Sequence, residues 1–292
     1  IGTGNMGNPM AGNLVKNGHH VTVHDLNRLA TTNLEEMGAS WADSPAKAAI
    51  GQDLVFTSLP TPQAVESVAL GEAGIIESIT PATVLADLST NSPTVIRRIH
   101  KAFAEIGVTV MDAPVSGGID GALVASLAVM VGGDKAVFDS IRPVLGSIGS
   151  NVIYCGPIGN GMVCKICNNL VNMGIGVLMA ESLTLGVKAG VDLAVLVDVM
   201  GKSSGGNYRL ERRSPQYLFR GNFEPGFAAA LASKDVRLAT DLGRELVLPM
   251  ALSNLVDQQY IETVARGWGE RDSDMVSVLQ EEKAGVQLRL PV

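Results

Sequence analysis

Residues 2–7 read Gly2-Thr3-Gly4-Asn5-Met6-Gly7, the GxGxxG pattern of a dinucleotide-binding turn. In this pattern the first glycine permits a tight turn, the second lets the backbone approach a pyrophosphate, and the third lets the following helix pack closely on a strand. The pyrophosphate would lie at the N-terminus of a helix predicted over Met6–Lys16, where free N–H groups and the helix dipole attract anions. The cofactor contacts expected in this turn are Gly2, Gly4, Asn5, Met6 and Gly7.

An acidic residue follows at the spacing that this motif requires. The strand predicted over His20–His24 ends in Asp25, about 18 residues after the last glycine of the turn. A carboxylate there accepts hydrogen bonds from the ribose hydroxyls of NAD and repels the 2′-phosphate of NADP, so we expect NAD, with NADP as the second choice. Arg28 lies close enough in sequence to soften that repulsion. Only Ile1 represents the strand that should precede Gly2, so we expect the sequence to lack the start of that strand.

Short apolar runs alternate with stretches of helical length over the first 150 or so residues. Strand–helix–strand alternation predicts a parallel sheet with helices on both faces. The predicted strands are His20–His24, Asp53–Leu59, Thr83–Asp87, Val108–Asp112 and Leu127–Val131, and the predicted helices between or after them are Pro9–Gly18, Leu29–Gly38, Pro62–Leu70, Pro93–Gly107 and Lys135–Ile148.

The pattern changes after Asn151–Pro157. Gly161–Gly190 contains no proline and predicts one long helix, and the sequence from Val191 onward predicts helices joined by turns rich in Gly, Pro and Ser. We therefore expect an α/β Rossmann-type N-terminal domain over residues 1–157, a long connecting helix over 158–190, and an all-α C-terminal domain over 191–292 for substrate binding and oligomerisation.

Composition limits the possible partners. The 292 residues are 46% hydrophobic, enough for a sizeable core, and the net charge of −7 without a basic run argues against nucleic-acid binding. We expect no membrane span, because the most apolar run, 170–180, is closed by Glu181. The three cysteines are an odd and low number, which does not indicate a disulfide framework. We therefore expect a reducing compartment: the cytoplasm, or the mitochondrial matrix in a eukaryote.

The segment around Lys165 is the candidate for proton transfer. No histidine follows His100, so a catalytic histidine in the second half is excluded. Lys165, Asn168 and Asn169 can share one face of the long helix, and buried asparagines need partners. A lysine removed from water in a cleft would exchange its proton near neutral pH. By spacing alone, a solvated lysine at a helix start is an equally good interpretation.

Two further motifs bear on the site. Ser116-Gly117-Gly118 follows a strand and exposes backbone N–H groups that suit a carboxylate, although an ordinary glycine turn has the same pattern. Cys164 and Cys167 form a CxxC without a second cysteine pair or a nearby histidine, so we expect buried, reduced thiols and no metal.

Together these pieces resemble the β-hydroxyacid dehydrogenase family, which includes 3-hydroxyisobutyrate dehydrogenase and tartronate semialdehyde reductase. The resemblance covers essentially the whole chain. It is carried by 2–7, Asp87-Leu-Ser89-Thr90-Asn-Ser-Pro93, Asp112–Gly118, Gly159-Asn-Gly161-Met-Val-Cys-Lys165-Ile-Cys-Asn168-Asn169, Lys234-Asp235 and Gly267-Trp-Gly269-Glu-Arg-Asp272.

The resemblance implies a role for each motif. It implies NAD-dependent oxidation of a β-hydroxy acid, or reduction of a semialdehyde, by an enzyme that pairs through its helical domain as a dimer or tetramer. The implied residues are Lys165 as general acid and base, Asn169 as an orienting residue, Ser116, Gly117, Gly118 and Asn168 at the substrate, Leu59, Pro60, Thr90 and Lys234 at the cofactor, and Asp272 in shaping that cleft.

Rivals and departures remain. Tartronate semialdehyde reductase is the alternative within the family. A catalytically inactive relative should have lost Lys165, and an imine reductase does not usually have a lysine there. Ala125 stands where the family often has glycine, and Ser273-Asp274 stand where it has an aromatic residue and serine. Substrate choice is expected to depend on Ser203–Arg212, where Tyr208, Arg209 and Arg212 could meet a polar or anionic tail. The alternative is that these arginines are exposed and simply solvated.

Overall fold

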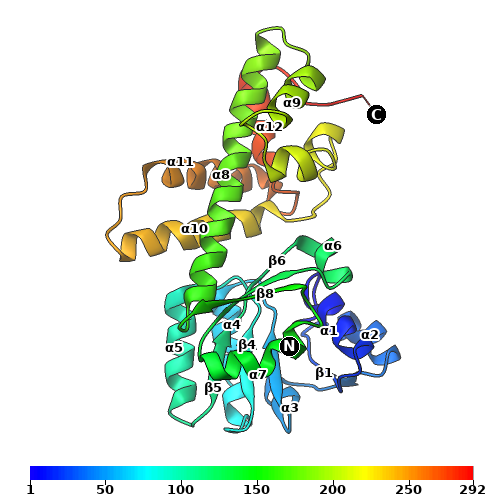
Figure 1. Cartoon of the computed structure of the whole chain (residues 1–292), viewed down its shortest axis with the longest axis vertical. Coiled ribbons are helices and arrows are strands. Elements are labelled where there is room, and N and C mark those ends of the chain that lie inside the picture. The colour runs from blue at the N-terminus through cyan, green and yellow to red at the C-terminus, as the bar shows by residue number, and fades with distance from the viewer. Residues whose placement is uncertain (292) are drawn as a thin grey trace. The chain divides into compact units, whose positions relative to one another are not determined.

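The computed structural model describes residues 1–291. By its internal contacts the chain divides into two compact units, Ile1–Lys165 and Ile166–Val292. The first unit is α/β and the second is helical, and a single long helix, α8, begins in the first and ends in the second (Figure 1). This arrangement confirms the predicted fold class. The domain boundaries at 157 and 190 stay a prediction.

The sheet of the α/β unit is mainly parallel but not entirely so. Strands β3, β4 and β5 are parallel neighbours, whereas β7 runs antiparallel to both β5 and β6. The wholly parallel sheet expected from sequence is therefore wrong at this edge. The strands are β1 (Thr22–Val23), β2 (Ser40–Trp41), β3 (Leu54–Thr57), β4 (Val84–Asp87), β5 (Thr109–Asp112), β6 (Val115–Ser116), β7 (Ala128–Gly132) and β8 (Asn151–Gly156).

The first two residues join the small β1–β2 sheet to the main one. The Ser58 N–H donates to the Ile1 carbonyl at 2.9 Å, and the Gly2 N–H donates to the His24 carbonyl at 2.9 Å. Ile1 and Gly2 therefore lie between the ends of β1 and β3. The glycine-rich turn thus begins at the centre of the unit, where a doubly wound sheet binds ligands.

Helices cover both faces of this sheet, as the alternation of side chains requires. Leu85 and Ala86 are neighbours on β4 but belong to two different apolar clusters, as successive strand residues point to opposite faces. The helices are α1 (Gly7–Lys16), η1 (Arg28–Thr31), α2 (Thr32–Glu36), α3 (Pro45–Ala49), α4 (Pro62–Leu70), η2 (Ile75–Glu77), α5 (Pro93–Ala104), α6 (Gly118–Leu123) and α7 (Lys135–Leu145).

Helix starts in this unit follow from local sequence. The side chains of Ser44, Thr61 and Ser92 each accept a hydrogen bond from a backbone N–H of the next turn, and a proline follows each of them. Such side chains satisfy the free donors of the first turn, and proline loses nothing there. The starts of α3, α4 and α5 are thereby fixed.

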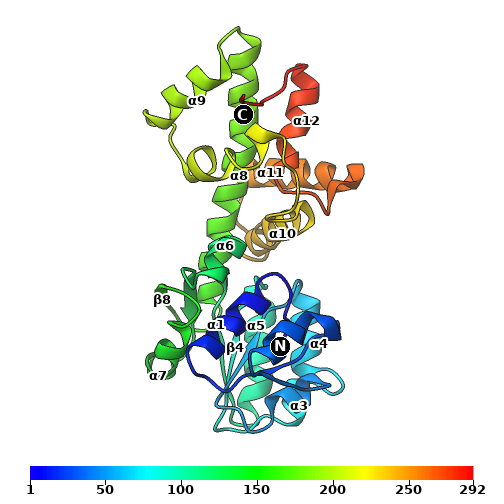
Figure 2. The ribbon, with the colours of Figure 1, turned by 90° about the vertical axis from the view of Figure 1, so that its right-hand side faces the viewer.

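The helical unit is built on α8. Helices α9–α12 surround it (Figure 2), and Met173, Met179 and Leu183 of α8 are buried in the two apolar clusters of this unit. The elements are α8 (Asn160–Lys188), α9 (Leu193–Gly201), η3 (Arg209–Arg213), η4 (Leu218–Arg220), α10 (Ala229–Glu245), α11 (Ala251–Thr263), η5 (Val264–Trp268) and α12 (Met275–Ala284).

Helix α8 also has the length and composition of a membrane-spanning helix. Among the described residues it is the one helix that is long and apolar enough to cross a membrane by length and composition. A core helix of a globular protein passes the same test. Lys165 and Asn169 are buried on this helix, which suits a core helix better than a lipid-facing one.

Candidate active site

The glycine-rich turn is tightly packed at Gly2 and Gly7, where no side chain fits, and open at Gly4, where a ligand can approach. A Cβ on Gly7 would lie 1.9 Å from the Gly2 carbonyl oxygen, and one on Gly2 would lie 2.4 Å from the Ser58 carbonyl oxygen. Gly4 faces open space. Met6, which precedes α1, makes no side-chain cap; the Asn8 N–H donates to the Gly4 carbonyl at 2.9 Å, and Pro9 has no N–H, so the open space for a ligand lies at Gly4 and before α1. The turn therefore fits a dinucleotide pyrophosphate.

Asp25 lies beside that turn, as predicted. Its Oδ2 accepts the Thr3 N–H at 2.7 Å, and its Oδ1 accepts the Asn27 N–H at 2.8 Å. A carboxylate oxygen can accept more than one hydrogen bond, so both oxygens retain capacity for ribose hydroxyls. The fingerprint turn and the acid are thus brought together by the backbone itself.

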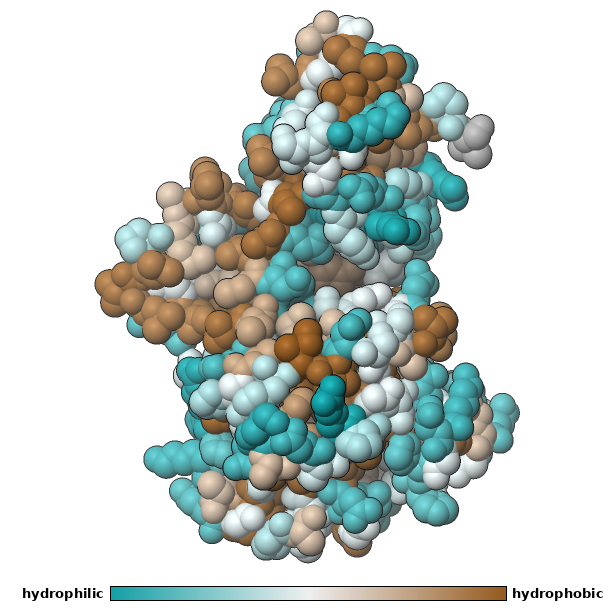
Figure 3. Space-filling model, viewed as in Figure 1, coloured by the Kyte–Doolittle hydropathy of each residue, from teal (hydrophilic) through white to brown (hydrophobic). Residues whose placement is uncertain are grey.

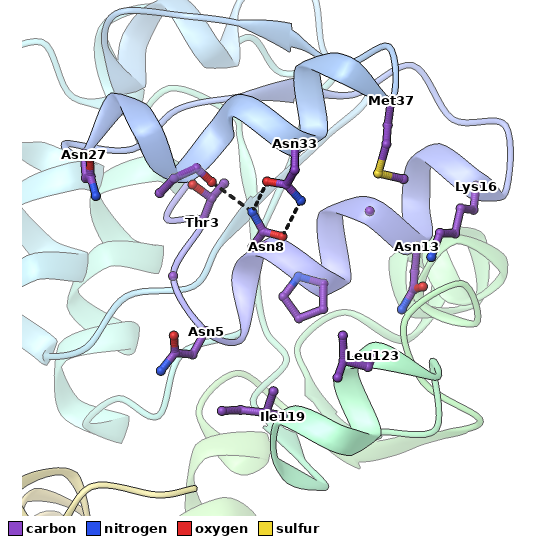
Figure 4. Close-up of a pocket in the computed structure, with 14 residues that line it drawn as sticks. Thr3, Asn5, Asn8, Asn13, Lys16, Asn27, Asn33, Met37, Ile119 and Leu123 are labelled. Carbon is purple, nitrogen blue, oxygen red and sulfur yellow. Dashed lines mark hydrogen bonds between the residues drawn. The ribbon is translucent and has the colours of Figure 1, made fainter. Parts of the chain in front are cut away.

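A cavity of about 580 Å³ opens next to the turn (Figure 4). Thr3 and Asn5 lie at one end of it, and Lys16 and Met37 lie at the other. Between them the Asn8 and Asn33 amides bond each other at 2.8 and 3.0 Å, which ties α1 to α2. Asn13, Asn27, Ile119 and Leu123 also line this cavity.

The ends of β3 and β4 are joined by the buried Asp87. Its carboxylate accepts hydrogen bonds from Thr57 Oγ1 at 2.9 Å, the Ser89 N–H at 3.0 Å and Asn91 Nδ2 at 3.0 Å. Burial raises the pKa of Asp87. The Ser89 hydroxyl in turn accepts the Leu59 N–H at 2.9 Å.

The hydrogen bonds around Asp87 extend through Ser89 to Leu59, one of the predicted nicotinamide contacts. Leu59, Pro60 and Thr90 follow β3 and β4 at the carboxyl end of the sheet; Leu59 and Thr90 are half-buried and Pro60 is exposed. Asp87 lies in one of the family motifs, but no role for it was predicted from the sequence. An acid at the end of an apolar strand is the signal that could have identified it.

The Ser116–Gly118 segment is exposed at its glycines. Gly117 and Gly118 have φ of 137° and 67°, and a Cβ on Gly118 would meet nothing within 4 Å. Ser116 ends β6 and is half-buried. Ala125, at the end of the α6 turn, has φ of 54°, a left-handed conformation that favours glycine. The glycine that the family often has there would remove this strain.

Asp112, at the end of β5, holds the start of α8. Its two carboxylate oxygens accept the Gly159 N–H and the Met162 N–H, both at 2.7 Å. Asp112 is fully buried, and burial raises its pKa to about 6, against the opposing effect of the two backbone donors. Since Met162 is three residues before Lys165, this buried acid fixes the turn from which the lysine projects.

Lys165 and Asn169 are both buried, at 7% and 5% exposure, one helical turn apart on α8. Asn169 Nδ2 donates to Asp235 Oδ2 at 2.6 Å, and Lys234 Nζ lies 3.0 Å from Asp235 Oδ1. Asp235 therefore brings Asn169 and Lys234 together, a role that the sequence analysis did not give it. The expected shared face is incomplete, because Asn168 is exposed and donates to Asn169 Oδ1 at 3.1 Å.

Asp272 is engaged inside the helical unit. Its carboxylate accepts from Arg213 Nη2 at 2.6 Å and from the N–H groups of Gly226 and Phe227 at 3.0 and 3.1 Å. It is completely buried and holds the 226–227 loop, and its part in shaping the cofactor cleft stays a prediction.

The expectation for Arg209 was wrong. Arg209 cannot meet a substrate tail, because it is 1% exposed and forms an ion pair with the equally buried Asp274, whereas Tyr208 and Arg212 are exposed. Sequence position alone suggested a solvated arginine, and the partner lies 65 residues away.

The cysteines also differ from expectation. Cys155, Cys164 and Cys167 form no disulfide among the described residues, and Cys164 and Cys167 are exposed rather than buried. Burial and the neighbouring Cys164 raise the pKa of the Cys155 thiol to about 12. Within residues 1–291, no group of three or more His, Cys, Asp or Glu side chains is arranged to hold a metal ion.

Comparison with known proteins agrees with this geometry. Residues 1–156 match the NAD binding domain of 6-phosphogluconate dehydrogenase, and residues 159–280 match the NAD-binding domain of NADP-dependent 3-hydroxyisobutyrate dehydrogenase. The chain is 37% identical to 2-(hydroxymethyl)glutarate dehydrogenase of Eubacterium barkeri, over 99% of this chain and 96% of that protein. It is 43% identical to 3-hydroxyisobutyrate dehydrogenase of Pseudomonas aeruginosa, over 82% of each.

A solved structure has the same fold. The 3-hydroxyisobutyrate dehydrogenase of Mycobacterium tuberculosis, solved with L-serine, superposes with a TM-score of 0.88 at 32% identity, over 95% of this chain and 96% of that one. Two family models together span nearly the whole chain, and its relatives are dehydrogenases. The chain therefore belongs to the β-hydroxyacid dehydrogenase family and is an NAD-binding oxidoreductase.

Proposed function

We propose that this chain reversibly oxidises the hydroxyl group of a short β-hydroxy acid, with Lys165 as general acid and base. The observation that carries the proposal is a buried lysine one helical turn from an asparagine amide that Asp235 holds at 2.6 Å. A lysine removed from water is neutral more readily and can exchange a proton near neutral pH. The alternative is use of the same site chiefly as a semialdehyde reductase, of the tartronate semialdehyde type.

The named relatives support one substrate class. 3-Hydroxyisobutyrate, L-serine and 2-(hydroxymethyl)glutarate are all 3-hydroxypropanoates, and they differ in the group on carbon 2: methyl, ammonium or carboxyethyl. We infer that this chain takes a 2-substituted 3-hydroxypropanoate, whose carboxylate and CH₂OH group are constant while the side group varies.

The residues divide the reaction between them. NAD, when bound, accepts the hydride from the hydroxyl carbon and returns it in the reverse direction. In the proposal, the backbone N–H groups of Ser116, Gly117 and Gly118 bind the substrate carboxylate. Lys165 Nζ takes the hydroxyl proton during oxidation and returns it during reduction. Asn169 hydrogen-bonds the reacting oxygen, and its orientation is set by Asp235.

Cofactor binding extends over other segments. In the proposal, the turn at 2–7 holds the pyrophosphate and Asp25 holds the ribose, which favours NAD over NADP. Leu59, Pro60 and Thr90 contact the nicotinamide half, and Lys234 closes over it. Asn168 is placed at the rim, because its side chain is exposed.

The first experiment measures NADH formation on 3-hydroxyisobutyrate, L-serine, glycerate and 2-(hydroxymethyl)glutarate. Lys165→Ala should reduce kcat by about 10²–10⁴-fold, the usual contribution of a positioned acid–base group, while NAD binding stays unchanged. Lys188→Ala is the matched control, since this exposed lysine lies at the other end of α8 and should leave kcat unchanged. Near-normal turnover by Lys165→Ala would exclude its role.

Assembly is proposed from the apolar surface of the helical unit. Figure 3 shows apolar side chains gathered over the end of α10 and the start of α11, where Leu246, Val247, Leu248, Leu252 and Leu255 are all more than half exposed. Contiguous apolar patches of this kind usually become interfaces. We propose a homodimer or homotetramer in the cytoplasm, or in the mitochondrial matrix of a eukaryote. Sedimentation velocity would show a monomer if the assembly proposal is wrong, and cell fractionation tests the compartment.

A further inference from the structure

Arg28 is the cation nearest in sequence to the ribose-binding acid. It begins η1, three residues after Asp25, whose carboxylate is oriented by the N–H groups of Thr3 and Asn27. A 2′-phosphate on the ribose would face the negative charge of Asp25, and a nearby arginine is the group that usually accommodates such a phosphate. Whether this protein tolerates NADP therefore depends on whether Arg28 is available.

The structure shows both terminal nitrogens of the half-exposed Arg28 guanidinium engaged. Nη2 donates to Glu35 Oε2 at 2.6 Å, and Nη1 donates to Glu35 Oε1 and, at 2.6 Å, to Thr31 Oγ1. The guanidinium carbon lies 4.3 Å from the ring centroid of Trp41. Bidentate hydrogen bonding to a carboxylate fixes the plane of the guanidinium, and stacking on an aromatic ring further restricts its position.

Glu35 is itself held in place and ionised. The hydrogen bonds from Arg28 and Thr31 lower its pKa to about 2. It lies on α2, which Asn33 joins to Asn8 of α1. Its neighbour Glu36 is exposed on the same short helix. The two glutamates therefore offer the same charge in adjacent positions, but only Glu35 is shown to hold Arg28 with both carboxylate oxygens.

We propose that Glu35 is a cofactor-specificity residue, which withholds Arg28 from the 2′-phosphate of NADP and so strengthens the preference for NAD that Asp25 sets. This inference rests on the proposed function through its preference for NAD. Discrimination then has two parts: repulsion by Asp25, and capture of Arg28, the nearest arginine in sequence, whose charge would offset that repulsion.

Isothermal titration calorimetry with NAD⁺ and with NADP⁺ on the full chain tests this without requiring turnover. Glu35→Gln should tighten NADP⁺ binding about three- to tenfold, the range expected for releasing one exposed charged group to a phosphate. NAD⁺ binding should stay within about twofold. Glu36→Gln removes the same charge one residue away and should leave both affinities unchanged. Arg28→Gln added to Glu35→Gln should abolish the gain.

The outcomes separate this inference from the proposed function. Unchanged NADP⁺ affinity in Glu35→Gln overturns the inference alone, provided that the wild type binds NAD⁺. So does an equal gain in Glu36→Gln, or a gain that survives the loss of Arg28, because either would show a general effect of charge. A wild type that binds neither nucleotide overturns the proposed function, and this inference with it.

Discussion

The two units bury acidic side chains in opposite ways. In the α/β unit, Asp87 and Asp112 are surrounded by neutral donors, namely backbone N–H groups, hydroxyls and an amide. In the helical unit, Asp272 and Asp274 are paired with Arg213 and Arg209. All four acids are at most 1% exposed, so the difference lies in the partners and not in the degree of burial.

This difference teaches what each arrangement needs. Neutral donors leave the cost of burying a charge only partly offset, so the pKa of both acids in the α/β unit is raised. These carboxyls can lose their charge and still accept hydrogen bonds. An acid paired with a buried arginine cannot lose its charge at low cost, because neutralising the acid leaves the arginine charge unpaired in the interior.

The largest effect should come from breaking the pairing in the helical unit. Asp274→Asn keeps the shape of the side chain but leaves Arg209 as a buried, uncompensated cation, which should cost about 3–5 kcal/mol of the free energy of unfolding. Urea unfolding measures this. The control is Asp139→Asn, which removes an exposed ion pair with Lys135 and should cost at most about 1 kcal/mol. Equal costs at the two positions would contradict the comparison.

A smaller effect should distinguish the α/β unit. The Asp112 carboxyl should titrate with a midpoint near pH 6, measured by NMR on protein with ¹³C-labelled aspartate and assigned with Asp112→Asn. Because its folded pKa lies above the ordinary value near 4, the stabilising contribution of this group is complete below about pH 4 and is lost as pH rises through 6. The loss should be about 2–3 kcal/mol. A midpoint below 4.5 would mean that the two backbone donors fully offset burial, which the comparison denies.

The smallest effect concerns backbone rather than charge. Ala125→Gly should raise the free energy of unfolding by about 0.5–1 kcal/mol, because it relieves the left-handed φ of 54°. Ala102→Gly, within helix α5, should lower it by a similar amount, since glycine is a poor helix former. Thermal unfolding of the two variants should therefore shift in opposite directions. Shifts of the same sign would show that the strain at Ala125 is not stored in the native state.

Sequence predicted the elements that local pattern determines. The glycine-rich turn, Asp25, the long helix and the principal strands each have a signal within a few neighbouring residues. Strands β2, β6 and β8 escaped prediction. Strands β2 and β6 have two residues each and exist only through pairing with β1 and β7, and the longer β8 pairs in parallel with β7. The antiparallel direction of β7 cannot be predicted from the residue types of that strand.

In the candidate site, too, features with a local sequence signal could be predicted and features that depend on distant partners could not. Lys165 was identifiable from its motif, but the hydrogen bond from Asn169 to Asp235 spans 66 residues, and the ion pair of Arg209 with Asp274 spans 65. A single sequence carries no local trace of such partners. For the same reason, the exposure of Cys164 and Cys167 depends on which side of α8 the other helices cover.

The boundary between the two compact units falls between Lys165 and Ile166, inside an unbroken helix. The proposed proton-transfer residue is thus the last of one unit, and its neighbouring amide, Asn169, belongs to the other. A helix turns by roughly 100° per residue, so inserting one residue at this junction would rotate Asn169 by that angle relative to Lys165. Recombination between relatives could exchange the two halves only if the junction kept its helical phase. The two halves can therefore be exchanged between relatives only where this one turn of α8 is inherited intact.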